Sequence, residues 1–134
     1  MLTRLGRVTI YVRDQDEALA FYVDKLGLEK RSDVMLGSMR WLTVAPFDQR
    51  DLEIVLQQPG DWMGEAERGV REAHIGQGTT WVFFTHDCRL EYEVLAGRGV
   101  RFTSPPEDQP YGIEATFEDL YGNSFSLLQP RADG

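Results

Sequence analysis

Few residues of this chain have the types and spacing that chemistry requires. His74 lies in a polar connector and His86 stands beside an expected helix start, so a surface position is the simpler interpretation of each. Cys88 follows the expected cap of a helix, whose N-terminus could favour a thiolate, but a small helix residue is the simpler interpretation. No nucleophile motif, phosphate-binding loop or zinc spacing is present in the sequence. Any site must therefore be assembled by the fold.

The elements that could assemble a site begin with a strand followed by a helix. Residues 7–12 alternate between an apolar face and a face that carries Arg7, Thr9 and Tyr11. Asp14 is expected to cap the helix that follows, because its carboxylate can accept a backbone N–H of the first turn. Gly27 suits the left-handed residue that ends a helix. Three β-type runs then follow, at roughly 28–34, 38–45 and 51–57.

The second half of the chain repeats this plan. A strand is expected at 79–85, a helix from the cap Asp87 to Arg98, and a stop at Gly99, followed by runs near 100–103, 112–118 and 123–128. The two halves close on similar tails, Leu56-Gln57-Gln58-Pro59 and Leu127-Leu128-Gln129-Pro130. Between them, residues 59–78 form a Gly-rich connector with a short helix expected near 62–72. Such a duplication predicts one cavity built from related sheets.

Composition excludes several classes of partner. The 134 residues suit one domain that buries about two-thirds of its unfolded surface. The formal charge of −8 disfavours nucleic acid, whose binding depends on Lys and Arg, and it would suit a cationic ligand. A single cysteine indicates a reducing, cytoplasmic location. No run approaches the ~20 apolar residues of a membrane span, so no membrane association is expected.

The order βαβββ–βαβββ resembles the vicinal oxygen chelate superfamily. The residues that carry the resemblance are Val12-Arg13-Asp14, Ala18, Phe21-Tyr22 and Leu26-Gly27 in the first half, and Gly97-Arg98-Gly99-Val100, Tyr111-Gly112 and Gly122-Asn123 in the second. The superfamily holds glyoxalase I, extradiol dioxygenases, fosfomycin-resistance transferases and bleomycin-binding proteins. The resemblance implies an α+β fold, a single domain over 1–134 with module one at 1–58, the connector at 59–78 and module two at 79–130. It also implies a homodimer.

The resemblance further implies where a metal would be bound. The superfamily's ligands correspond to Arg7, Val55, Thr80 and Ser126 in this sequence. Arg is a permanent cation, Val has no donor atom, and neutral hydroxyls are poor substitutes for imidazole or carboxylate. We therefore predict no metal of the superfamily type and no cofactor.

The same positions predict the ligand-binding residues, because side chains two residues apart share a face of a strand. Arg7 is the sharpest of them, since its guanidinium can bind a carboxylate or phosphate bidentately; its alternative is to pair with Glu53. Tyr111 and Glu114 are added because their segment often borders the cavity in relatives. The predicted lining is Arg7, Thr9, Tyr11, Glu53, Val55, Gln57, Thr80, Val82, Phe84, Tyr111, Glu114, Ser124, Ser126 and Leu128.

Two kinds of function compete, and a third possibility is a relative whose cavity has lost any small-molecule role. The first is a glyoxalase/bleomycin-resistance-like protein that binds a small molecule without metal chemistry. The second is an enzyme of the lyase or dioxygenase class with an atypical metal site, or with metal-free acid–base chemistry by Glu53, Glu114 or Tyr111. The sequence names no catalytic residue and no particular ligand.

Overall fold

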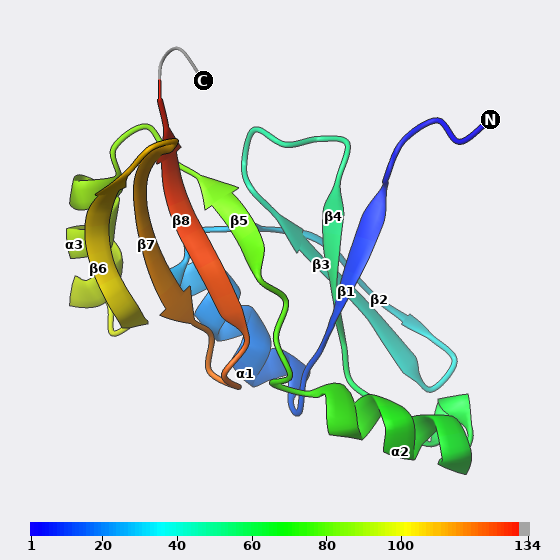
Figure 1. Cartoon of the computed structure of the whole chain (residues 1–134). Helices are drawn as coiled ribbons and strands as arrows, with labels where there is room; N and C mark the ends of the chain where they lie inside the picture. Colours follow the sequence, from blue (N-terminus) through cyan, green and yellow to red (C-terminus); the bar gives the residue numbers. More distant parts are fainter. Residues whose placement is uncertain (132–134) are drawn as a thin grey trace. The chain divides into compact units, whose positions relative to one another are not determined.

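The computed structural model describes residues 1–131, which divide into two compact units, Met1–Gly76 and Gln77 onward (Figure 1). Each unit is an α+β module with one four-stranded sheet, as the duplication predicts. No helix among the described residues is long and apolar enough to cross a membrane.

The first unit contains the sheet β1–β4 and two helices. Its order along the chain is β1 (Arg7–Tyr11), α1 (Gln15–Ala20), a π-helical turn η1 (Phe21–Lys25), β2 (Glu29–Leu36), β3 (Met39–Ala45), β4 (Glu53–Gln57), a 3₁₀ turn η2 (Asp61–Met63) and α2 (Glu65–His74). In the sheet the strands lie in the order β1-β4-β3-β2, with β1 parallel to β4 and the other neighbours antiparallel.

The second unit repeats the arrangement without a counterpart of α2. It contains β5 (Trp81–Phe84), α3 (Cys88–Gly97), β6 (Arg101–Gln109), β7 (Gly112–Glu118) and β8 (Ser124–Pro130). The strand order β5-β8-β7-β6 matches that of the first sheet, and β5 is parallel to β8.

The sequence correctly predicted how the helices begin and end. The Asp14 carboxylate accepts the Glu17 N–H at 3.0 Å, and the Asp87 carboxylate accepts the Leu90 N–H at 3.1 Å. Gly27 (φ 78°) and Gly99 (φ 91°) both adopt the left-handed conformation expected of helix stops. The first helix differs from the prediction because it widens into a π turn after Ala20, where the Leu26 N–H bonds to the Phe21 carbonyl.

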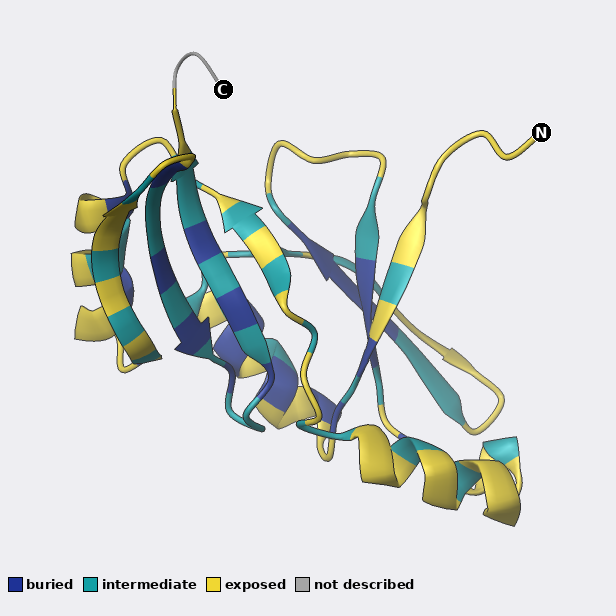
Figure 2. Cartoon of the chain, in the orientation of Figure 1, coloured by how far each residue is buried: buried dark blue, intermediate teal, exposed yellow. Residues whose placement is uncertain are grey.

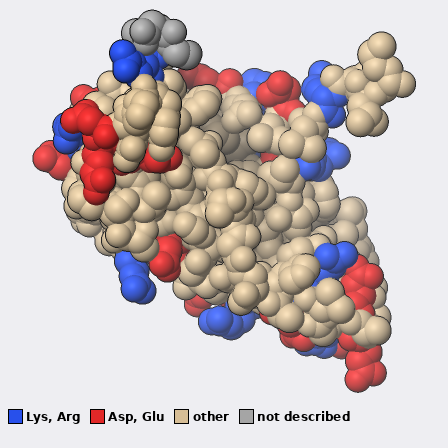
Figure 3. All heavy atoms as spheres, in the orientation of Figure 1, with Lys and Arg blue, Asp and Glu red and all other residues tan. Residues whose placement is uncertain are grey.

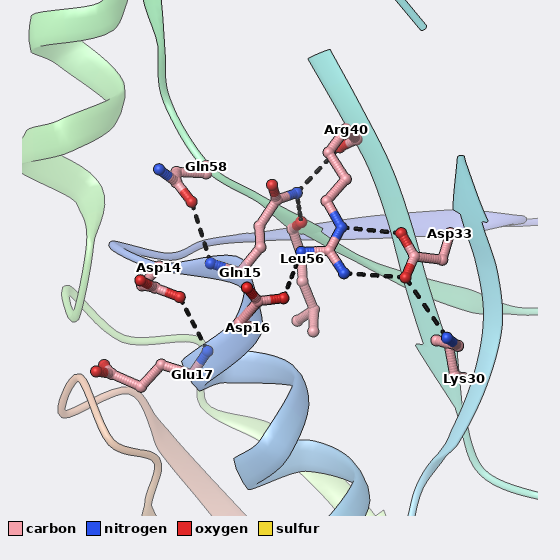
Figure 4. A network of polar contacts seen from close by, with 9 residues as sticks. All are labelled: Asp14, Gln15, Asp16, Glu17, Lys30, Asp33, Arg40, Leu56 and Gln58. Atoms are coloured by element: carbon pink, nitrogen blue, oxygen red, sulfur yellow. Dashed lines mark hydrogen bonds and ion pairs between the residues drawn. The ribbon is translucent and has the colours of Figure 1, made fainter. Parts of the chain in front are cut away.

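The similar tails of the two halves have a structural reason. The side-chain oxygen of Gln58 accepts the backbone N–H of Gln15 at 3.1 Å, and that of Gln129 accepts the N–H of Cys88 at 3.0 Å. Gln15 and Cys88 are the first residues of α1 and α3, whose N–H groups lack partners within the helix. A glutamine at the end of the last strand therefore ties each helix to its sheet (Figure 4).

A second bond in each unit strengthens this tie. The Gln15 amide donates to the Leu56 carbonyl at 2.9 Å and to the Arg40 carbonyl at 3.0 Å. The Cys88 thiol occupies the corresponding place and donates to the Leu127 carbonyl at 3.5 Å. The two helices are therefore anchored alike although the anchoring side chains differ in size.

We call the helix-bearing side of each sheet its back face. On the back face of the first sheet the buried residues are mostly aliphatic, with Ile10, Val12, Leu42, Val44, Ile54 and Leu56 beneath Ala18 and Tyr22. The back face of the second sheet is an aromatic cluster, in which Phe117 and Phe125 lie 5.4 Å apart between ring centroids. Trp81 packs on Phe125, with 6.1 Å between the ring centroids, and so lies on the same face. Burial alternates along β7 and β8 (Figure 2).

Candidate functional site

The opposite side of the first sheet, its front face, brings together the residues predicted in the first half. The parallel pairing of β1 with β4 sets Arg7 beside Glu53, Thr9 beside Val55, and Tyr11 beside Gln57. β3 joins them through Thr43, which pairs with Val55. Because paired residues share a face, the front face includes Arg7, Thr9, Tyr11, Trp41, Thr43, Glu53, Val55 and Gln57.

Arg7 packs against an indole ring rather than against a carboxylate. Its guanidinium carbon lies 5.5 Å from the centroid of the Trp41 ring, within the range of a cation–π contact. No ion pair joins Arg7 to Glu53 among the described residues. The Glu53 carboxylate instead accepts the Thr43 hydroxyl at 2.5 Å, so the ion pair named as the alternative is not formed in this structure.

Helix α2 supplies a part of this face that the sequence did not predict. The Arg71 guanidinium carbon lies 5.3 Å from the Tyr11 ring centroid, and the His74 ring lies 6.2 Å from the same ring. Their spacing of three residues places both on one side of a helix. The three-residue spacing of Arg71 and His74 was visible in the connector sequence. The strand residue that these two side chains contact depends on how the connector folds back.

Ion pairs run along α2 and the turn before it. Arg68 pairs with Asp61 and with Glu72, while Arg71 pairs with Glu67 at 3.2 Å. In Figure 3 basic and acidic side chains are intermixed at the α2 end of the first unit. These exposed pairs each stabilise the helix by only about 0.3–0.5 kcal/mol.

The front face of the second sheet gathers most of the residues predicted in the second half. Val82 pairs with Ser126, and Phe84 with Leu128. β7 adds acidic and hydroxyl side chains through its pairing with β8. The front face of the second sheet consists of Val82, Phe84, Glu114, Thr116, Glu118, Ser124, Ser126 and Leu128.

Thr80 does not extend this face as predicted. The strand begins at Trp81 rather than at residue 79, and Thr80 adopts φ 51°, which is unusual for a β-branched residue. Its hydroxyl donates to the Thr79 carbonyl at 2.7 Å. The alternation of side chains therefore stops before Thr80, because its backbone is not extended.

Tyr111 and Glu114 form a direct contact, as their predicted grouping suggested. The Tyr111 hydroxyl donates to a Glu114 carboxylate oxygen at 2.6 Å. This hydrogen bond raises the pKa of the phenol above its ordinary value of 10.0, because the neutral phenol is the donor. Tyr111 therefore stays protonated at neutral pH and is the hydrogen-bond donor of this pair.

The other reactive side chains have structural positions. Cys88 is fully buried, and burial raises the pKa of its thiol, so the helix N-terminus does not produce a thiolate there. His86 is exposed just before the cap of α3. Both findings agree with the simpler interpretation of these residues.

The residues present do not fit the superfamily's metal site. Arg7, Val55, Thr80 and Ser126 provide a guanidinium, an alkyl group and two neutral hydroxyls, which are poor ligands for a divalent cation. Within residues 1–131, no three His, Cys, Asp or Glu side chains cluster where they could hold a metal ion. The donor chemistry of these four positions therefore supports no metal-dependent step.

Comparisons with known proteins agree with this architecture. The sequence model of the Glyoxalase/Bleomycin resistance protein/Dioxygenase superfamily matches residues 4–127, and the chain belongs to that superfamily. An uncharacterized protein of Bacillus subtilis (strain 168), YurT, is 37% identical over 122 residues, which cover 90% of this chain and 94% of that protein.

Two solved structures are similar over nearly the whole chain. UcmS2 has a TM-score of 0.86 and 42% identity, with 96% of this chain and 98% of that one covered. TnmS3, an antibiotic binding protein from Streptomyces sp. CB03234, has a TM-score of 0.78 and 29% identity, with 97% and 98% covered.

Proposed function

We propose that this protein binds a small organic molecule on the front face of its first sheet, without the superfamily's metal chemistry. The observation that carries the proposal is the front face of the first sheet. Where the superfamily places a metal ligand, this chain has Arg7 packed on Trp41, among hydroxyl, amide and aromatic side chains. Apolar walls with a few polar groups are what a small-molecule site requires. The similarity to TnmS3, an antibiotic binding protein, supports a natural product as the ligand.

The proposal includes the setting in which the protein works. We expect a homodimer in the cytoplasm, because chains of this architecture cover sheet edges with a partner and the single cysteine suits a reducing compartment.

Thermal unfolding in the presence of candidate ligands tests the proposal. Antibiotics, glutathione conjugates, aromatic acids and divalent metals are added in turn at fixed protein concentration. An organic compound at one hundred times its Kd should stabilise the fold by about 2.7 kcal/mol and raise Tm by several degrees. Co-purification of stoichiometric Zn, Ni, Mn or Fe, with an activity lost on chelation, would contradict it.

A metal-free enzyme is a second candidate, favoured by the hydrogen bond between Tyr111 and Glu114. The phenol could donate a proton to a bound compound while Glu114 takes one up. Mass spectrometry of the compound recovered from the complex separates the two functions. A binding protein returns the compound unchanged, whereas an enzyme converts it and loses that conversion in Tyr111→Phe.

A further inference from the structure

We infer that the ligand carries an acidic group and that the Arg7–Trp41 pair receives it. This inference rests on the proposed function and specifies the charge of the ligand. It reverses the expectation from the formal charge of −8, because that total does not describe the front face of the first sheet.

Arg7 has its hydrogen-bonding edge available. The residue is exposed, and within residues 1–131 its contact is with the face of the Trp41 ring, not with a carboxylate. The guanidinium is a planar fork of N–H groups, and no carboxylate among the described residues forms an ion pair with it. That geometry matches the two oxygens of a carboxylate.

The Trp41 ring restrains the guanidinium before a ligand arrives. Trp41 belongs to β3, an interior strand whose next residues, Leu42 and Thr43, are fully buried. An arginine side chain that is free in water loses rotamer entropy when a ligand fixes it. The contact with Trp41 has already restricted part of that freedom, so less is lost on binding.

Glu53 is the acidic member of this front face. Its carboxylate accepts the Thr43 hydroxyl at 2.5 Å and forms no ion pair with Arg7 among the described residues. Glu53 nevertheless stands beside Arg7 in the sheet. Its negative charge must weaken the binding of an incoming acid, so its removal should strengthen that binding.

A second cation lies toward the far end of the same face. Tyr11 is four residues beyond Arg7 on β1, about 13 Å along an extended strand, and Arg71 stacks on its ring. The pairing of Arg71 with Glu67 is exposed and weak. Arg71 can therefore exchange partners when a longer acidic ligand reaches it.

Three probes that share one ring system test the charge of the ligand. We would titrate 2-naphthoate, 2-naphthylmethanol and 2-naphthylmethylammonium into the full chain and follow the indole N–H signals of its three tryptophans by NMR. Trp41→Phe identifies the Trp41 signal. The naphthoate should bind at least tenfold more tightly than the alcohol or the ammonium and should shift the Trp41 signal.

Substitutions then locate the effect. Arg7→Gln should weaken naphthoate binding at least tenfold while leaving that of the alcohol unchanged, and Glu53→Gln should strengthen naphthoate binding severalfold. Arg50→Gln is the matched control, because Arg50 stacks on Phe47 in the same unit but in the loop between β3 and β4; it should change nothing. Inorganic phosphate added to the naphthoate complex shows whether any oxyanion can occupy the site. If it can, phosphate competes with naphthoate for binding.

Several outcomes would overturn the inference. The role of Arg7 as the receptor of an acidic group would be refuted by any of three results. These are equal affinity for the three probes, unchanged naphthoate binding in Arg7→Gln, and no binding of naphthoate at millimolar concentration. None of these results refutes small-molecule binding itself, which the thermal screen judges with its wider panel. A ligand from that screen that is neutral or cationic and shifts Trp41 would uphold the function and reject the acidic group.

Discussion

Gly112, the first residue of β7, occupies a position where no other residue fits. Its φ of 149° is rarely adopted by residues with a side chain, and a Cβ there would lie 2.1 Å from the Gln129 carbonyl oxygen of β8. The obstacle is backbone of the neighbouring strand, which cannot move without disturbing the β7–β8 pairing. Glycine is therefore required after Tyr111 for a steric reason that lies within the second unit.

Replacing this glycine should destabilise the protein strongly. We expect Gly112→Ala to lower the free energy of unfolding by about 3 kcal/mol, because the methyl group must displace the strand. Urea unfolding followed by circular dichroism measures the change. Gly69→Ala is the control, since Gly69 lies in α2 with nothing within 4 Å of its added Cβ. The control should gain up to about 1 kcal/mol from helix propensity; equal effects of both substitutions would contradict the steric account.

Residue by residue, the sequence predicted the faces better than the contacts. Alternation placed Arg7 and Glu53 on one face, and the register confirms this. It could not predict that Arg7 reaches Trp41 across β4, because alternation says nothing of side-chain reach or sheet twist. Thr80 was misplaced for a related reason, since its left-handed backbone is invisible to a pattern of residue types.

At the scale of elements, Arg40 joins three parts of the first unit. From β3 it pairs with Asp33 of β2 at 2.8 Å and with Asp16 of α1 at 2.7 Å (Figure 4). The Arg40 guanidinium lowers the pKa of the Asp33 carboxyl from 3.8 to about 2. The Arg40 side chain therefore links β2 and α1 to β3.

This network predicts a defined pH dependence of stability. Because the pKa of Asp33 is depressed in the folded state, its contribution is present above about pH 4 and is lost as the pH falls toward 2. Asp33→Asn should lower the free energy of unfolding at pH 7 by about 0.5–1 kcal/mol, a modest value because the pair is near solvent. Chemical denaturation at several pH values measures it, with Asp48→Asn in an exposed loop as the control. A deficit that persists unchanged at pH 2 would show that the charge is irrelevant.

Element types and helix ends were predictable, whereas β6 was not. Asp14, Asp87, Gly27 and Gly99 have local roles, so the sequence nearby determines them. The strand expected near 100–103 extends to Gln109 through two consecutive prolines. Proline is tolerated there because β6 is an edge strand with register shifts, a fact that only the assembled sheet reveals.

At the scale of the whole molecule, the repeat preserves anchoring and varies the surface. Both units use a glutamine at the end of the last strand to hold a helix. Their front faces differ, because the first carries Arg7 packed on Trp41, whereas the second carries the two carboxylates Glu114 and Glu118. Family membership was recognisable from the sequence because the order of elements and residues such as Asp14, Gly27 and Gly99 carry the resemblance. The ligand was not recognisable, because it depends on the varied residues of the front faces.

The chain should form a dimer in solution. Val34, Met35 and Leu36 of β2 are each more than half exposed, and β2 is an edge strand of its sheet, a combination that usually requires cover. Sedimentation equilibrium at micromolar concentration should give about twice 15.3 kDa. Met35→Lys should shift the protein toward monomer, whereas Val70→Lys on the exposed side of α2 should not. A mass of 15.3 kDa for the unsubstituted chain would refute the dimer.

The anchoring of α3 through Cys88 also allows local opening of the second unit to be measured by chemical labelling. Cys88 is the chain's one thiol, and it is fully buried against the carbonyl of Leu127. An alkylating reagent can reach it only in molecules whose helix has separated from the second sheet. The rate of Cys88 alkylation therefore measures how often α3 separates from the second sheet. It does not report on the first unit, where Gln15 occupies the same place.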